Sequence, residues 1–279
     1  MQPIAVLIAT RNRERLLCDR ALRSVAAQSH RPAAVVVAND GAPLSESVRC
    51  RIRDVAAPGA ATLLQNSRAP GAAGAWNTGL QWLRDRGHAG FVAILDDDDE
   101  WDPDHLESNA RAATESAADL TVSGLRLRMA GVDRPRPLID ALRAEDFLTG
   151  NPGWQGSNTF ARLSLLLAVG GFRDGLASLN DRDLAVRVLR TPGVRATVVL
   201  RWTATWHLDP GTGLSSAGSA AKLRGLAAFW SLYGGEMSEI QAERFFARSE
   251  RLFGFDRESI VAQNVDLPSR GASRGDLHE

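Results

Sequence analysis

The sequence contains little cysteine, little lysine and no excess of either charge. Its two cysteines, Cys18 and Cys50, are too few and too far apart for a metal-binding cysteine cluster or a disulfide framework, which indicates a reducing compartment. Lys222 is the only lysine, so arginine carries nearly all of the positive charge. The 33 basic and 33 acidic side chains cancel, which argues against a protein that binds nucleic acid by neutralising many phosphates. We therefore expect a globular protein with no nucleic-acid partner.

Apolar runs long enough to cross a membrane are also missing. Residues 4–9 are too few for the core of a signal peptide, and no basic segment precedes them. Residues 163–169 fall far short of the ~20 apolar residues that a transmembrane helix needs. We therefore expect a cytoplasmic protein without a transmembrane segment. Peripheral contact with a membrane stays open, because the helices expected near the C-terminus could lie on a membrane, cover a binding site or pack in a homodimer.

The first half of the chain alternates short β-rich apolar runs with stretches of helical period. This alternation is typical of an α/β domain with a mostly parallel, Rossmann-like sheet and helices on both of its faces. The expected strands are residues 4–8, 34–38, 62–64 and 91–95. The expected crossover helices are residues 13–28 and 73–86.

Longer strands, at residues 120–129 and 194–200, are expected in the second half, and helices follow them. Between these strands lies a glycine-rich segment, residues 151–156, whose composition is typical of a loop that contacts a substrate. Two further helices are expected within residues 220–253, broken at Gly234-Gly235. We divide the chain into a main domain at residues 1–213 with halves 1–118 and 119–213, a helical extension at 214–267 and a polar, disordered tail at 268–279.

The most informative segment is a row of four aspartates, Asp96 to Asp99, directly after an apolar strand. Open α/β folds bind their ligands at the carboxyl ends of strands, which is where this row lies. Adjacent carboxylates repel one another unless a cation neutralises them, and Mg²⁺ and Mn²⁺ prefer such oxygen ligands. In an extended chain Asp96 and Asp98 would point to one side and Asp97 and Asp99 to the other, so one pair could serve a ligand and the other the scaffold. The alternative is an acidic loop that caps the next helix through an aspartate at position 102 or 104.

Four segments of the first 110 residues occur in a recognisable order. They are a loop after the first strand, the end of the second strand, a glycine-rich helix start and the acidic row, at residues 9–13, 36–41, 66 with 71–79, and 95–101. Together they resemble glycosyltransferase family 2, whose members have the GT-A fold, and the acidic row resembles the Asp-x-Asp metal motif of that family. One departure is Trp76, where the family usually has Arg, so Arg68 could supply the missing polar contact.

The resemblance implies a metal-dependent, inverting glycosyltransferase. Its donor would be a UDP-, dTDP- or GDP-sugar with Mn²⁺ or Mg²⁺ on the diphosphate, and its acceptor a hydroxyl or amine of a small molecule, a glycan or a lipid-linked molecule. Asp98 is expected to bind the metal, Asp96 the ribose and Asp40 the base, although Asp40 could instead form an Asp-Gly turn and the Thr10 side chain could cap a helix. The residues expected around the donor are Thr10, Arg11, Arg13, Asp40, Arg68, Gly71, Asn77, Asp96, Asp97 and Trp154.

A second pair of segments carries the expected general base. Residues 170–174 and 180–184 resemble the Gly-Gly-Phe and Glu-Asp-x-Asp-Leu motifs of the family, and the resemblance assigns the base to Asp181. Asn180 stands where the family commonly has Glu, which removes a neighbouring charge. A base here would take the acceptor proton as the acceptor oxygen attacks the sugar. The structural alternative is that Asp181 caps the following helix.

Two ring side chains of the second half are further candidates. His207 follows the last expected strand, and the resemblance implies that it reaches the metal or the diphosphate, for which neutral imidazole is a competent ligand. Trp154 could offer a flat apolar face to a sugar ring. Each residue has a structural alternative, because a lone His or Trp often serves packing alone.

Other functions are less compatible with the motifs. A sugar nucleotidyltransferase also holds a metal with aspartates, but its glycine-rich loop with a basic residue is missing after the first strand. A non-catalytic sugar-nucleotide binding module should lack the acidic residue at position 181. A dinucleotide-dependent dehydrogenase is disfavoured because no Gly-x-Gly-x-x-Gly follows the first strand.

Overall fold

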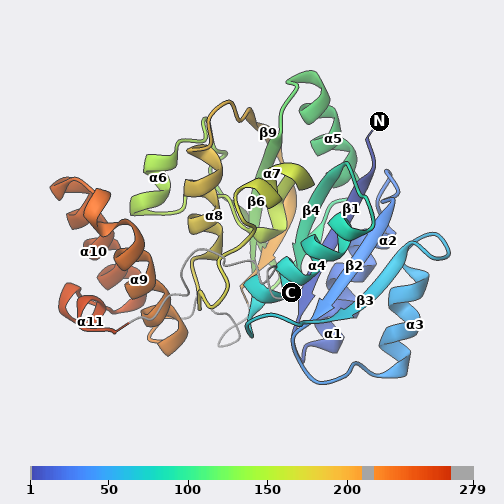
Figure 1. The fold of residues 1–279 in the computed structure, drawn as a ribbon, viewed down its shortest axis with the longest axis horizontal. Coiled ribbons are helices and arrows are strands. Elements are labelled where there is room, and N and C mark those ends of the chain that lie inside the picture. Colours follow the sequence, from blue (N-terminus) through green and yellow to red (C-terminus); the bar gives the residue numbers. More distant parts are fainter. Residues whose placement is uncertain (1, 209–216, 265–279) are drawn as a thin grey trace, which may run out of the picture.

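Four parallel strands form one half of a nine-stranded sheet in the computed structural model, which describes residues 2–208 and 217–264 (Figure 1). They lie in the order β3-β2-β1-β4, and all four predicted strands of this half are confirmed. β1 is buried along its whole length, because helices cover both of its faces. The strands are β1 Ile4–Thr10, β2 Ala34–Asn39, β3 Ala61–Gln65 and β4 Phe91–Asp96.

The other half of the sheet is mixed in direction. β8 is antiparallel to both β4 and β6, whereas β9 is parallel to β6. The prediction that the last strand ends at residue 200 is wrong, because β9 continues to pair with β6 after register shifts beside Gly124 and ends at His207. The strands of this half are β5 Glu100–Trp101, β6 Leu120–Met129, β7 Val132–Pro135, β8 Thr159–Arg162 and β9 Ala196–His207.

Helices cover both faces of the sheet, and the alternation along β1 shows how. Val6 and Ile8 belong to a core shared with η1, α2, α3 and α5, whereas Leu7 belongs to a core shared with α4, α7 and the C-terminal helices. The short α1, which precedes η1, has no buried residue. Gly79 lets α4 approach β1 closely, since a Cβ there would lie 2.2 Å from Leu7 Cδ1. These helices are α1 Glu14–Leu16, the π-helical η1 Leu17–Leu22, α2 Arg23–Ala26, α3 Glu46–Asp54, α4 Ala72–Asp85, α5 His105–Glu115 and α7 Leu163–Ala168.

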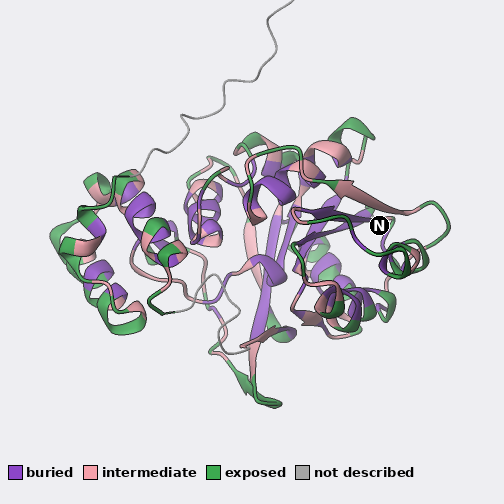
Figure 2. Cartoon of the chain, turned by 90° about the horizontal axis from the view of Figure 1, so that it is seen from below, coloured by how far each residue is buried: buried purple, intermediate pink, exposed green. Residues whose placement is uncertain are grey.

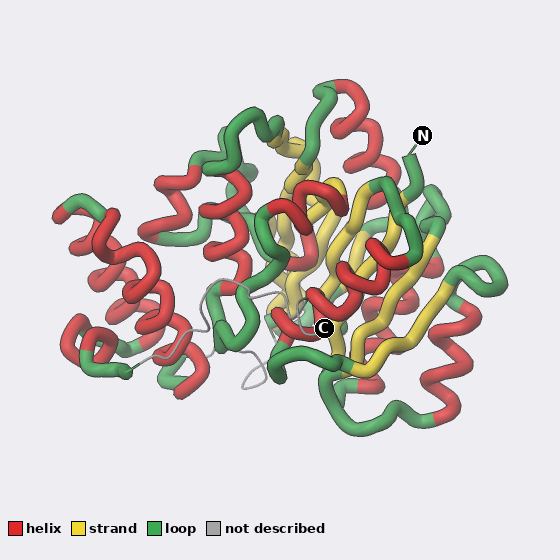
Figure 3. Tube along the Cα trace, in the orientation of Figure 1, coloured by secondary structure: helices red, strands yellow, loops and turns green. Residues whose placement is uncertain are grey.

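The C-terminal helices lie beside α6 and α8, at the end of the molecule opposite β3 (Figures 1 and 3). The two predicted helices are confirmed as α9 and α10, with the short η3 at the predicted break, and their outer sides are exposed while the central strands are buried (Figure 2). In the described ranges, no helix is long and apolar enough to cross a bilayer. The remaining helices are α6 Ala144–Thr149, η2 Gly156–Asn158, α8 Asn180–Leu189, α9 Ala220–Tyr233, η3 Gly234–Glu236, α10 Glu239–Phe253 and α11 Arg257–Val261.

The structure combines a mixed, mostly parallel sheet, helices on both faces and a helical extension, as predicted. The boundary drawn between residues 213 and 214 and the tail at 268–279 lie outside the described residues. The division into domains therefore stays a prediction.

Candidate active site

The acidic row begins where β4 ends, at the carboxyl edge of the parallel strands. One carboxylate oxygen each from Asp96, Asp98 and Asp99 lies within 4.8 Å of the others. The predicted alternation of side chains is wrong, because the chain leaves the extended conformation after Asp96 and forms a turn in which the Asp99 N–H donates to the Asp96 carbonyl at 3.2 Å. This turn brings three carboxylates together and separates Asp97 from them.

Asp97 is fully buried and binds two other residues that the sequence placed at the donor. Its carboxylate accepts hydrogen bonds from Thr10 Oγ1 at 2.7 Å and from Arg13 Nε at 3.2 Å. The Arg13 guanidinium also pairs with Asp98, and Arg20 Nη1 donates to the Asp98 carbonyl at 2.9 Å. Thr10 therefore does not cap a helix through its hydroxyl; it anchors the first loop to the acidic row.

Asp99 is held by the opposite half of the sheet. Ser157 Oγ donates to it at 2.5 Å, and the backbone N–H of His207 donates to it at 3.0 Å. The His207 ring does not belong to the carboxylate group, and its Nε2 lies 3.5 Å from Glu100 Oε1. The bond from Ser157 also explains why the segment 151–158 matters to the site, because it ties this loop to the acidic row.

The electrostatics of the row favour a cation. Burial raises the pKa of Asp96 and of Asp99 well above the ordinary value, and the neighbouring carboxylates raise both further. Burial also raises the pKa of Asp97 to about 6, against the opposing effect of Arg13. Carboxylates crowded in this way are stabilised by a hard divalent cation, which prefers oxygen ligands. The donor set of Asp96, Asp98 and Asp99 therefore fits Mg²⁺ or Mn²⁺.

Helix capping does not explain the acidic row. Asp104 occupies the N-cap position of α5, but its carboxylate forms no cap bond to the backbone of the helix. It accepts instead from Ser108 Oγ at 3.2 Å and pairs with Arg201 at 2.6 Å.

Asp40 connects three loops at the end of β2. Its carboxylate accepts from Asn66 Nδ2 at 2.6 Å, from the Gly71 N–H at 2.8 Å and from Arg11 Nη1 at 3.3 Å. Gly71 has a φ of +123°, which a side chain would rarely adopt. The structure thus places Arg11, Asp40 and Gly71 together at the edge of the sheet where the acidic row also begins.

Asn77 and Arg68 join the start of α4 to the Gly-Gly-Phe segment. Asn77 Nδ2 donates to the Phe172 carbonyl at 2.7 Å and to Asp174 Oδ1 at 2.8 Å, while Arg68 Nε donates to Asp174 Oδ2 at 2.9 Å. Trp76 packs on Phe172 with ring centroids 4.4 Å apart. The residue that departs from the family motif therefore serves packing, and Arg68 makes a polar contact from a neighbouring position.

Asp181 lies in the first turn of α8, two positions after the strained N-cap residue of this helix. Leu179 has a φ of +67°, and strain of this kind concentrates at functional sites. The Gly156 N–H lies close enough to the Asp181 carboxylate to lower its pKa, and Gly156 also borders Asp96, because a Cβ there would lie 3.1 Å from Asp96 Oδ1. Asp181 and Asp96 therefore approach the same backbone segment, and the charge of Asp181 raises the pKa of Asp96.

The protonation of Asp181 is tuned close to neutrality. Burial raises its pKa to about 7, although Lys222 on α9 and the Gly156 N–H lower it. A carboxylate with a pKa near the working pH can accept and release a proton efficiently. The sequence did not suggest a role for Lys222 beyond its rarity.

Asp183, one helical position beyond Arg182, has a structural role. It is fully buried, and its oxygens accept from Arg173 Nε at 3.0 Å, Arg187 Nη2 at 2.7 Å and the Tyr233 hydroxyl at 2.8 Å. These bonds connect α8 to α9.

The expectation that Trp154 offers its ring to a sugar is wrong. Its ring is fully buried, stands edge-on to Phe147 at a centroid distance of 5.7 Å and donates from Nε1 to Thr159 Oγ1 at 2.7 Å. A ring enclosed in this way offers no face to a sugar, so the packing alternative describes it correctly.

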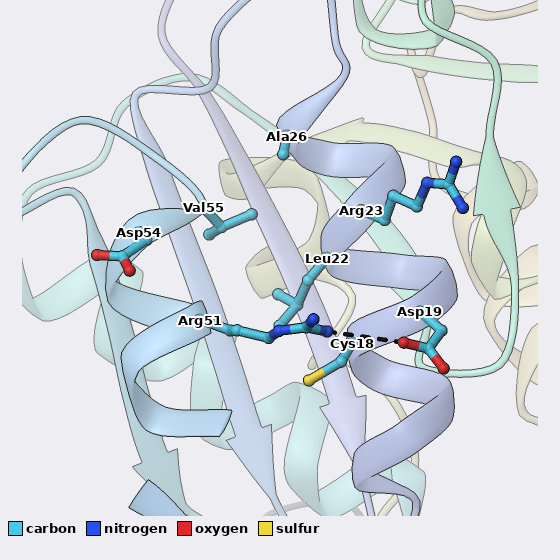
Figure 4. Close-up of a pocket in the computed structure, with 8 residues that line it drawn as sticks. All are labelled: Cys18, Asp19, Leu22, Arg23, Ala26, Arg51, Asp54 and Val55. Carbon is cyan, nitrogen blue, oxygen red and sulfur yellow. Dashed lines mark ion pairs between the residues drawn. The ribbon is translucent and has the colours of Figure 1, made fainter. Parts of the chain in front are cut away.

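A cavity of about 580 Å³ lies away from these residues, between η1–α2 and α3 (Figure 4). Asp19 and Arg51 form an ion pair across it at 3.6 Å. None of the expected site residues lines it; its lining consists of Cys18, Asp19, Leu22, Arg23, Ala26, Arg51, Asp54 and Val55. The candidate active site is instead the edge formed by the ends of β1, β2 and β4, loop 151–158 and the start of α8.

Comparison with known proteins identifies the family. The chain resembles TarS 1–349 of S. aureus, solved with UDP-GlcNAc, at 19% identity and a TM-score of 0.63 over 94% of this chain and 76% of that one. It also resembles the mannosyltransferase PcManGT of Pyrobaculum calidifontis, solved with GDP-Man and Mn²⁺, at 21% identity and a TM-score of 0.60 over 90% and 70% of the two chains. A comparison with curated proteins gives no significant match. The family model "Glycosyl transferase family 2" matches residues 5–187, and the chain therefore belongs to glycosyltransferase family 2, with the GT-A fold.

Proposed function

We propose that this glycosyltransferase inverts the configuration of the transferred sugar, with Asp181 as the general base. The observation that carries the proposal is the position of Asp181. It lies beside Gly156, as does Asp96 of the acidic row, and burial raises its pKa to about 7. A half-buried carboxylate with this pKa, beside a row that fits a cation, supports acid–base chemistry at the donor. Family membership favours this function over the sugar nucleotidyltransferase.

In the proposed reaction the acceptor oxygen or nitrogen attacks the anomeric carbon from the side opposite the diphosphate. The new glycosidic bond forms as the bond to the phosphate oxygen breaks, and the electron pair leaves with the nucleoside diphosphate. Asp181 accepts the proton that the acceptor loses. A single carboxylate base is sufficient for this displacement.

The acidic row would bind the metal and the ribose. Asp96, Asp98 and Asp99 would hold Mn²⁺ or Mg²⁺, which supplies a Lewis acid that offsets the charge of the departing diphosphate. Asp96 would also accept hydrogen bonds from ribose hydroxyls. Asp97 would act indirectly, because it fixes Thr10 and Arg13 against the row.

Arg11 and Asp40 would bind the nucleotide at the ends of β1 and β2. Hydrogen bonds from Asn66 and Gly71 hold the Asp40 carboxylate in place. The nucleobase of the donor would therefore bind a carboxylate whose orientation is already fixed. The complexes of TarS with UDP-GlcNAc and of PcManGT with GDP-Man support a UDP- or GDP-sugar as donor. We further propose that the enzyme works in the cytoplasm.

A screen of nucleoside diphosphates tests this proposal. The melting temperature would be measured with UDP, GDP and dTDP, each with and without Mn²⁺. We expect one nucleotide to stabilise the protein by several degrees only when the metal is present, because binding to the folded state raises its stability. NMR of the product anomer then reports inversion or retention. The proposal would be contradicted if the nucleotide stabilised the protein equally with and without Mn²⁺, or if the product retained the configuration of the donor sugar.

A further inference from the structure

α6, α8, α9 and α10 lie together at one end of the molecule (Figure 1). Four cationic side chains from this region, one of them adjacent to Asp181 in the sequence, lie close enough to affect one another's pKa. We call Arg136, Arg182, Lys222 and Arg248 the basic cluster. Arg182 directly follows Asp181 on α8, Lys222 lies on α9 and Arg248 on α10, whereas Arg136 follows β7. Arg182 and Lys222 are almost fully buried, and Arg136 and Arg248 are half-buried.

Three of these side chains surround the end of α6. Arg182 Nη2 donates to the Leu148 carbonyl at 2.7 Å, and its guanidinium lies 4.2 Å above the Phe229 ring. Arg136 Nη2 donates to the Asn151 carbonyl at 3.2 Å. Arg248 borders Gly150, where an added Cβ would lie 3.4 Å from its Nε. Three guanidinium groups are therefore gathered around residues 147–151.

The charge of these arginines is not balanced locally. Across residues 2–208 and 217–264, Arg136, Arg182 and Arg248 form no ion pair with a carboxylate, whereas Arg173 and Arg187 nearby both pair with Asp183. Burial and, to a smaller extent, the charge of Arg248 lower the pKa of Arg182 to about 9. Burial and, to a smaller extent, the charge of Arg248 also lower the pKa of Arg136. Buried charges are normally paired, so a cluster of this kind favours binding of an anion.

We propose that the basic cluster binds an anionic group of the acceptor, a phosphate or a carboxylate, and so brings the acceptor nucleophile to Asp181. The planar guanidinium of Arg248 can bind such an oxyanion through two parallel hydrogen bonds. Arg248 is half-buried, and Gly150, which borders its guanidinium, places no side chain over it. The proposal rests on the proposed function, because Asp181 defines the place where the acceptor must lie.

The connection to the base is short along the chain. Residues 150–156 lead from the basic cluster to Gly156, whose N–H lowers the pKa of Asp181. Arg182 supplies a second connection, because it follows Asp181 on the same helical turn. An anion held at the cluster would therefore fix an acceptor against the segment that also holds the base.

Titration with small anions tests the proposal. The donor site is first filled with Mn²⁺ and the nucleoside diphosphate that stabilises the protein most, so that added phosphate cannot bind there. Inorganic phosphate, glycerol phosphate and acetate are then titrated at constant ionic strength while the melting temperature is recorded. We expect a saturable rise with phosphate or acetate, and an apparent affinity about tenfold weaker in the variants Arg248→Gln and Arg136→Gln.

Arg244→Gln is the matched control, because Arg244 is exposed on the same helix α10. It should keep the full response. No saturable rise in the wild type, or an equal loss in Arg244→Gln, would overturn the proposal, since the response would then reflect general charge. Binding to phosphatidylglycerol vesicles but not to phosphatidylcholine vesicles would support a lipid headgroup as the source of the anion, provided that Arg248→Gln loses this binding. Binding of glycerol phosphate without vesicle binding would support a soluble anion.

The two proposals fail separately. If Asp181→Asn keeps normal transfer while anion binding still depends on Arg248, the base assignment is wrong and the anion site stands. If nucleotide and metal bind as expected but no anion does, the proposed donor chemistry stands and the acceptor inference is wrong.

Discussion

The acidic row after β4 and the basic cluster beside α8 carry opposite charge and are built in opposite ways. Four consecutive residues make the acidic row, whereas the basic cluster takes its members from positions 136 to 248 and from separate elements. In both regions, burial and like charges act in the same direction: burial and neighbouring carboxylates raise the pKa of Asp96, and burial and the Arg248 guanidinium lower the pKa of Arg182. A formal net charge of zero therefore conceals two regions that each favour a counter-ion.

Asp181 lies between the acidic row and the basic cluster and connects the two. Gly156 links it to the acidic row, and the charge of Lys222 links it to the basic cluster. Burial raises the cost of ionising Asp181, and the charge of Lys222 reduces that cost. We infer that the acidic row serves the donor, the basic cluster serves the acceptor and the base works where they meet.

Replacing the base should have the largest effect. Asp181→Asn removes the proton acceptor but keeps the shape of the side chain, so we expect transfer to fall by up to about 10⁴-fold while donor binding stays within about twofold. Single-turnover transfer and calorimetric titration of the nucleotide would measure the two quantities. Asp146→Asn, an exposed acid on α6, is the control and should keep both.

The same substitution should not destabilise the protein. Because the folded-state pKa of Asp181 is about 7 and an unfolded Asp titrates near 4, the folded protein binds this proton more tightly. Stability from this group is therefore lost as the pH rises from about 4 to about 7. At pH 8, Asn at position 181 should raise the free energy of unfolding by up to about 4 kcal/mol, because each of the roughly three pKa units corresponds to about 1.4 kcal/mol. Urea denaturation measures this change. A clear loss of stability would indicate a structural role for the carboxylate.

Removal of a carboxylate from the acidic row should come next. We expect Asp98→Ala to lower transfer by about 10²–10³-fold and to abolish the stabilisation that Mn²⁺ adds to nucleotide binding, because the cation loses a ligand. Asp104→Asn is the control, since Asp104 pairs with Arg201 outside the carboxylate group. An unchanged response to Mn²⁺ in Asp98→Ala would show that the row is a scaffold without a metal.

A smaller effect should follow from Lys222, which faces Asp181 from the side of the basic cluster. The positive charge lowers the pKa of Asp181, so Lys222→Met should move the midpoint of the rising limb of kcat/KM from near pH 7 to higher pH by about one unit. Lys222→Arg keeps the charge and should keep the midpoint. An unchanged pH profile in Lys222→Met would show that the charge of the basic cluster does not affect the protonation of Asp181.

The acidic row could be predicted because its chemistry lies in adjacent residues after a continuous apolar strand. Its local geometry could not, since the turn after Asp96 depends on bonds from Thr10, Ser157 and His207, which lie far away in the sequence. The basic cluster could not be predicted at all, because only the docking of α9 and α10 brings its members together. Trp154 shows the same limit, as its glycine-rich surroundings suggest exposure although Phe147 covers it.

The length of β9 illustrates a second limit of sequence patterns. Leu200 and Trp202 are exposed within the strand, so the expected alternation of buried residues is interrupted at residues 200–202. Pairing with β6 continues through this interruption because Gly124 accommodates the register shift. The pattern alone therefore ends the strand too early and places His207 in a loop.

The smallest expected effect tests how firmly the helical extension holds α8. The Tyr233 hydroxyl donates to Asp183, and Tyr233→Phe leaves this buried carboxylate with only its arginine partners. We expect a loss of about 2 kcal/mol in the free energy of unfolding, because hydrogen bonds to charged groups are stronger than neutral ones. Ser249→Ala, which removes a buried neutral bond within α10, is the control and should cost about 1 kcal/mol or less. If Tyr233→Phe costs no more than this control, α9 is held to α8 by apolar packing; if it costs more and also weakens anion binding, the Asp183 bonds keep the basic cluster assembled beside the base.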